Sequence, residues 1–98
     1  MAPDAIAATA RLLPEFLDPA ATPPAKSAYV LRSSAFEVQF GWDGTEWTSD
    51  AGRDACVIEG APESLLLYAL GRTSFEESDL ETNRPSEARA FKRYLGGP

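Results

Sequence analysis

Residues 36–47 have the sequence FEVQFGWDGTEW, and this segment decides the fold class. In its first half, large apolar side chains occupy every second position as far as Trp42, and the positions between them are polar or glycine. This alternation is typical of a half-buried antiparallel strand with one face on the core. The pair Asp43-Gly44 follows at once and favours a two-residue hairpin turn. We therefore expect a hairpin whose second strand covers residues 45–49.

The tight turn also sets an expected register for the hairpin. A two-residue loop places Trp42 opposite Thr45 and Phe40 opposite Trp47. The aromatic side chains then share one face and hold the register by cross-strand packing. Because tryptophan combines a large apolar surface with one polar N–H group, Trp42 and Trp47 are candidates for lining an apolar ligand pocket. The alternative is that both are core side chains.

Further strands and helices are expected on both sides of this hairpin. A period of two predicts strands at 28–33, 55–59 and 80–82, the first four strands of the chain forming a meander. Helical spacing predicts helices at 5–17, with an interruption at Pro14, and at 62–70 and 85–95. The sequence therefore predicts an α+β fold, with an antiparallel sheet of about four to five strands and helices on one face. We expect residues 1–25, a helix and a proline-rich linker, to pack on an α+β domain at 26–98.

The composition limits the chemistry available to the chain. Its 98 residues suffice for one domain, and they include no histidine and a single cysteine. The lack of histidine excludes imidazole metal sites, Ser-His-Asp triads and Cys-His dyads formed by this chain alone. We therefore expect no metal site and no catalytic residue. Cys56 has no second cysteine with which to pair, which favours a reducing, cytoplasmic setting, and its inward strand position predicts an inert buried thiol.

The charge of the chain bears on its partners. Fifteen acidic and nine basic residues give a net charge of −6, which disfavours binding to a phosphate backbone. No apolar run approaches the roughly 20 residues that cross a bilayer. The sequence therefore predicts no nucleic acid partner, no membrane partner and a cytoplasmic location.

One segment is similar to a known family. The stretch from Cys56 to Arg72 contains a strand, Gly60, a leucine-rich helix and a final Gly71-Arg72. It resembles the C-terminal domain of the mycothiol-dependent maleylpyruvate isomerase family. The turn and tryptophan at residues 43–47 look like the equivalent part of that domain, so the resemblance extends over about residues 26–95. It implies a sterol-carrier-like domain that packs against a separate helical domain holding the metal.

The resemblance also implies what this chain lacks. Without the histidine-bearing helical domain, we expect no isomerase activity from the chain alone, and mycothiol as a cofactor only together with a partner domain. Asn83-Arg84 stands where the family usually has Gly-Asp, a departure that affects any contact made by the acidic residue.

Arg72 is the candidate site residue that the resemblance favours most. The family pattern places an arginine where it can reach the active-site cleft, and a guanidinium there can bind a carboxylate bidentately. The alternative is that Arg72 stabilises the end of the preceding helix. Leu67 and Tyr68 add apolar surface away from the main stripe of this helix, so they are candidates for a ligand or partner surface.

These observations predict a non-catalytic accessory or binding domain. It would hold a small acidic or apolar ligand, or dock a helical-bundle partner, through the surface of the leucine-rich helix. The alternatives are a sterol-carrier-like carrier of a hydrophobic small molecule and a homodimeric structural module.

Overall fold

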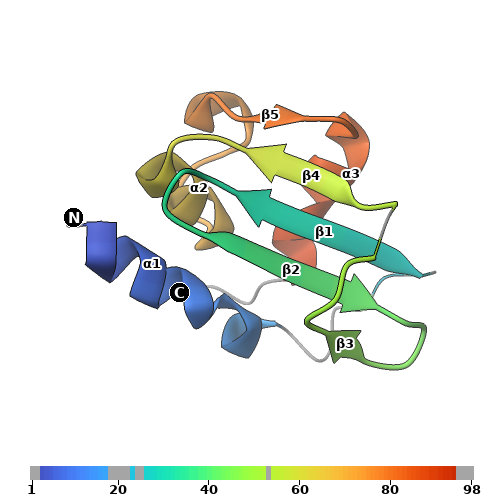
Figure 1. The fold of residues 1–98 in the computed structure, drawn as a ribbon. Helices are drawn as coiled ribbons and strands as arrows, with labels where there is room; N and C mark the ends of the chain where they lie inside the picture. Colours follow the sequence, from blue (N-terminus) through green and yellow to red (C-terminus); the bar gives the residue numbers. More distant parts are fainter. Residues whose placement is uncertain (1–2, 18–22, 24–25, 53, 95–98) are drawn as a thin grey trace.

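The protein folds as an open five-stranded sheet with helices on one face (Figure 1). This description comes from a computed structural model and covers residues 3–17, 23, 26–52 and 54–94. The strand order is β3-β2-β1-β4-β5. The strands are β1 (Ser27–Arg32), β2 (Glu37–Trp42), β3 (Trp47–Thr48), β4 (Cys56–Glu59) and β5 (Glu81–Thr82). The α+β class predicted from the sequence is confirmed.

All the main helices pack on the same face of the sheet, and α2 and α3 lie behind it in the view of Figure 1. The helical segments are α1 (Pro3–Arg11), η1 (Leu13–Phe16), α2 (Pro62–Ala69), η2 (Glu76–Ser78), α3 (Pro85–Ala90) and η3 (Phe91–Tyr94). Strand side chains such as Tyr29 and Phe40 meet Ile6 of α1, Leu65 of α2 and Phe91 of η3 in one buried core. The N-terminal helix is therefore part of the same core as the sheet. None of these described helices has the length and apolarity needed to cross a membrane.

The connection between β3 and β4 differs from the predicted meander. β4 runs parallel to β1, with Tyr29 beside Cys56 and Arg32 beside Glu59. The chain leaves β3 and crosses the sheet face opposite the helices through residues 50–52 and 54–55, which we call the strap (Figure 1). The chain crosses this face because Ala51 and Ala55 are buried there against Val30. This second, small apolar cluster stabilises a crossing that a purely antiparallel order does not require.

The register predicted for the hairpin is wrong. Trp42 lies opposite Trp47, because the loop between β2 and β3 contains four residues instead of two. The Asp43 carboxylate accepts hydrogen bonds from the backbone N–H groups of Thr45 and Glu46, both at 2.8 Å. These bonds fix the longer loop, as aspartate commonly does at turns. The two indole rings still pack together, with centroids 5.4 Å apart.

The predicted helix boundaries are largely confirmed. Pro14 lies in the separate turn η1, so the first helix ends before it. Pro62 occupies the first turn of α2, and Gly71 follows this helix with φ of 78°, a left-handed conformation that favours glycine. Most of the predicted proline-rich linker and the end of the last predicted helix, at residues 18–22, 24–25 and 95–98, lie outside the described residues.

Candidate functional site

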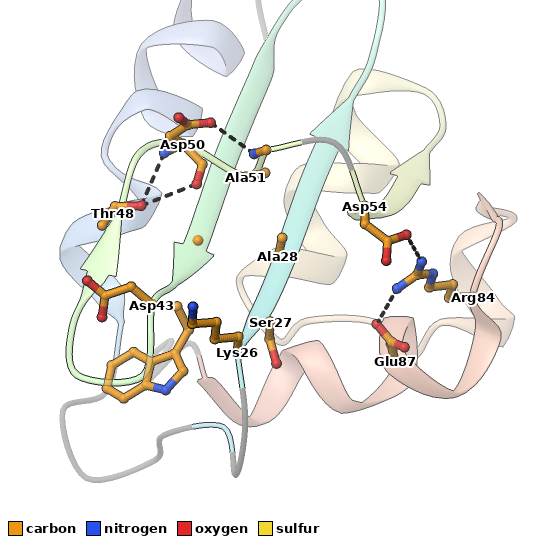
Figure 2. A pocket seen from close by; sticks show the side chains of 13 residues that line it. Lys26, Ser27, Ala28, Asp43, Thr48, Asp50, Ala51, Asp54, Arg84 and Glu87 are labelled. Carbon is orange, nitrogen blue, oxygen red and sulfur yellow. Dashed lines mark hydrogen bonds and ion pairs between the residues drawn. The ribbon is translucent and has the colours of Figure 1, made fainter.

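A pocket of about 460 Å³ opens on the sheet face that carries the strap (Figure 2). We call it the strap pocket. Ala28 of β1 and Gly41 of β2, which are neighbours in the sheet, lie at its base, and Ala51 and Gly52 of the strap line one side. The small size of these residues leaves the space open. The other lining residues are Lys26, Ser27, Trp42, Asp43, Thr48, Asp50, Asp54, Arg84 and Glu87.

The strap is held close to the sheet beside Gly41. A Cβ atom at this position would lie 2.9 Å from Thr48 Oγ1 and nearer still to the carbonyl oxygen of Asp50. Thr48 Oγ1 donates a hydrogen bond to that same carbonyl at 3.2 Å. The Ala51 N–H donates to Gln39 Oε1 at 3.1 Å. The absence of a side chain at Gly41 is therefore what lets the strap form this wall of the pocket.

The other end of the strap is fixed by two residues that precede α3. The Arg84 guanidinium pairs with Asp54 of the strap and lies 3.6 Å from a carboxylate oxygen of Glu87 (Figure 2). The Asn83 side chain donates to the carbonyl of Ala55 at 3.2 Å and accepts from the N–H of Val57 at 2.8 Å. This amide therefore extends the pairing of β4 beyond the two residues of β5. Asn83-Arg84, noted in the sequence only as a departure from a family pattern, anchors the strap.

The strap pocket has an acidic lining. Among the lining residues that the structure describes, four carboxylates and two cationic groups give a formal charge of 2 − 4 = −2. Hydrogen bonds from the backbone of Glu46 and Thr45 lower the pKa of Asp43, and the charge of Lys26 contributes to the same shift. The Asp50 carboxylate accepts a hydrogen bond from the Gly52 N–H at 2.9 Å. No ion pair of Asp50 with a cationic group occurs within the described parts of the chain.

The described residues contain neither a cluster of metal ligands nor an activated thiol. No group of three or more His, Cys, Asp or Glu residues could hold a metal ion in these segments. Cys56 is fully buried, and its sulfur lies 3.6 Å from Thr82 Oγ1 and from the carbonyl oxygen of Arg84. Burial raises the pKa of this thiol, which keeps it in the protonated, unreactive form.

The two tryptophans proposed from the sequence have different positions. Trp42 is half-buried and borders the strap pocket, whereas Trp47 is not among the residues that line it. The Trp47 ring packs against the main core, with its centroid 5.8 Å from that of Tyr94. Its indole N–H is buried and has no hydrogen-bond partner among the residues that the structure describes. Only Trp42 therefore remains as a pocket residue among the aromatic candidates.

Of the two candidates on α2, Leu67 is exposed as predicted and Tyr68 is not. Tyr68 is fully buried, so its expected position away from the core is wrong. Its hydroxyl donates a hydrogen bond to the carbonyl of Ala88, and burial raises the pKa of this hydroxyl. Leu67 is 37% exposed. The backbone N–H of Arg72 donates to the Leu67 carbonyl at 2.9 Å and that of Gly71 to Tyr68 at 3.0 Å, which closes the helix end. The Arg72 side chain is exposed and lines neither described pocket.

A second open pocket of about 420 Å³ lies near the other end of β1. Its lining includes Arg32, Glu59 and Glu81. The Arg32 Nε donates to Glu37 at 2.8 Å, and the same guanidinium lies 3.6 Å from Glu59. This arginine is thus already engaged by two carboxylates and is a weaker candidate for receiving a ligand.

Comparisons with protein-family models, with curated proteins and with solved structures found no match to this chain. The resemblance to the maleylpyruvate isomerase C-terminal domain stays a prediction, together with the sterol-carrier-like fold and the link to mycothiol. The site must therefore be interpreted from its own geometry.

Proposed function

We propose that the protein is a non-catalytic binding domain that holds a small molecule in the strap pocket. The observation that carries this proposal is the pocket itself: its volume of about 460 Å³ is within the usual range of small-molecule sites. Residues from β1, β2, the strap and α3 converge on it, although they are far apart in the sequence (Figure 2). Small side chains at its base keep it open.

The lining residues favour binding over catalysis. General acid–base catalysis needs a group that titrates near the working pH. The pKa of Asp43 is shifted in the opposite direction, and the carboxylates of Asp54 and Glu87 are engaged by Arg84. The Cys56 thiol, the only sulfur nucleophile in the chain, is buried in the core and does not line the pocket.

The strap pocket has more support than the surfaces foreseen from the sequence. The burial of Tyr68 leaves Leu67 as the main apolar side chain exposed on α2, which weakens docking of a helical partner there. Large side chains such as Phe40 and Phe91 fill the layer between sheet and helices, their rings 5.4 Å apart. This packing gives little support to a carrier with an internal lipid cavity.

Titration monitored by NMR tests the proposal. The probes are 1,4-diaminobutane, 1,4-butanediol and butanedioate, which share a four-carbon chain and differ in charge. Binding of at least one probe should shift the backbone amide signals of Ala28, Gly41 and Ala51. The variant Ala28→Leu should abolish these shifts because the larger side chain fills the base of the pocket. Ala8→Leu, which adds the same atoms to an exposed position of α1, is the matched control.

Two results would contradict the proposal. One is that all three probes leave the pocket amides unchanged at millimolar concentration. The other is that the signals of Leu67 and Arg72 move instead, which would assign binding to the end of α2.

A further inference from the structure

The carboxylates of the strap pocket are distributed around it instead of being gathered at one point. Asp43 belongs to the β2–β3 loop, Asp50 and Asp54 to the strap, and Glu87 to α3 (Figure 2). No three of the described acidic side chains lie close enough together to hold a metal ion. A pocket of about 460 Å³ with separated carboxylates suits a molecule that spans several ångströms more than it suits a bare ion.

The two described cationic side chains that line the pocket, Lys26 and Arg84, already have acidic neighbours. Arg84 pairs with Asp54 and lies near Glu87, so two carboxylates surround one guanidinium. Lys26 is close enough to Asp43 to contribute to the lowering of its pKa. An acidic ligand would have to displace these carboxylates, and it would also approach a chain with a net charge of −6. Among the pocket carboxylates, Asp50 shows no ion pair within the described segments.

We propose that the ligand of the strap pocket is a small organic cation, such as an amine, whose positive nitrogen is received by Asp50. This inference rests on the proposed binding function and differs from the small acidic or apolar ligand predicted from the sequence. The apolar part of such a ligand lies over Ala28 and Gly41, and the acidic lining supplies the attraction. The positive charge of the ligand compensates the formal charge of −2 of the lining residues that the structure describes.

Dissociation constants of the three four-carbon probes test the ligand class. At low salt, 1,4-diaminobutane should bind about fivefold more tightly than 1,4-butanediol, since an exposed ion pair contributes up to about 1 kcal/mol. Butanedioate should bind more weakly than the diol. Raising the salt to about 0.5 M should remove most of the preference because it screens exposed charges.

A charge-neutralising variant identifies the receiving residue. Asp50→Asn keeps an oxygen that can accept from the Gly52 N–H and removes only the charge, so the fold of the strap is preserved. It should weaken binding of 1,4-diaminobutane about fivefold. Glu15→Gln changes the net charge by the same amount on η1, outside the pocket lining, and should leave binding within about twofold.

The possible outcomes separate the two proposals. If the diol or butanedioate binds at the pocket as tightly as the diamine, the proposed preference for a cationic ligand is wrong, and the proposed binding function is retained. If Glu15→Gln weakens diamine binding as much as Asp50→Asn, the attraction is that of the whole chain and the assignment to Asp50 is wrong. If no probe shifts the pocket amides, both proposals fail.

Discussion

Replacement of Gly41 by alanine should separate the strap from the sheet. The new Cβ would start 2.9 Å from Thr48 Oγ1, whereas ordinary contacts begin at 3.4 Å, so the neighbouring atoms must retreat by at least 3.4 − 2.9 = 0.5 Å. The nearest obstacle is the backbone of Asp50, which cannot rotate away as a side chain can. Overpacking of this kind costs about 1–3 kcal/mol, and loss of the Ala51–Gln39 hydrogen bond adds about 1 kcal/mol.

Urea unfolding and amide exchange would measure this effect. Gly41→Ala should lower the free energy of unfolding by about 2–4 kcal/mol, and the Ala51 amide, bonded to Gln39, should exchange faster with solvent. Gly44→Ala is the control for backbone strain, because its Cβ would meet no atom within 4 Å and the residue, with φ of 109°, lies in the β2–β3 loop outside the strap, so it should leave the protection of the Ala51 amide unchanged. Unchanged protection of the Ala51 amide in Gly41→Ala would refute the close approach of strap and sheet.

Three further changes test other contacts. Asn83→Asp removes the donor to the Ala55 carbonyl and places a charge beside it, so urea unfolding should show a loss of about 1–3 kcal/mol; equal stability would contradict the anchoring role. Tyr68→Phe leaves the buried carbonyl of Ala88 without its donor and should cost about 1–2 kcal/mol by calorimetry, while an unchanged Tm would argue against this bond. Asp43→Ala tests the pH dependence of stability. Folding lowers the pKa of the Asp43 carboxyl, so this group stabilises the folded protein at a pH above its unfolded pKa of about 3.9. This contribution is lost as the pH falls through the lower pKa of the folded state. The variant should therefore melt below the parent at pH 7 and close to it at about pH 2; a gap independent of pH would oppose this reasoning.

The elements that depend on local sequence were predictable. Alternation located β2, and Pro62 and Gly71 marked the two ends of α2. The sequence Ser74-Phe75-Glu76-Glu77 has the spacing of a capping box, and the reciprocal hydrogen bonds between Ser74 and Glu77 form at 3.1 Å in both directions. These features succeed because each depends on neighbours within a few residues.

The long-range features were not predictable in the same way. The choice between a meander and the parallel pairing of β1 with β4 depends on where the strap packs, and no local signal at Ala51 or Ala55 specifies their burial against Val30. The hairpin register failed because Asp43-Gly44 is compatible with loops of two or four residues, and the side chain of Asp43 selects the longer one.

The candidate site shows the same limit. Trp42 was foreseen and does border the strap pocket, but the charged residues around it come from distant segments. Arg84 and Asp54 are thirty positions apart in the chain and meet only in the folded structure. Tyr68 was assigned to a surface from helical periodicity alone, which does not reveal that η2 and α3 cover part of α2, whereas Leu67 is exposed as predicted.

The shortness of the two outer strands bears on self-association. β3 and β5 each contain only two residues, and a long exposed edge is what allows a sheet to recruit a strand from another molecule. In the described structure, the β5 side of the sheet therefore ends in an edge that can form few intermolecular backbone hydrogen bonds, whereas on the β3 side residues 37–40 of β2 have no strand partner. We expect elongation of β5 by designed residues to promote strand-paired aggregates, which sedimentation at rising protein concentration would detect.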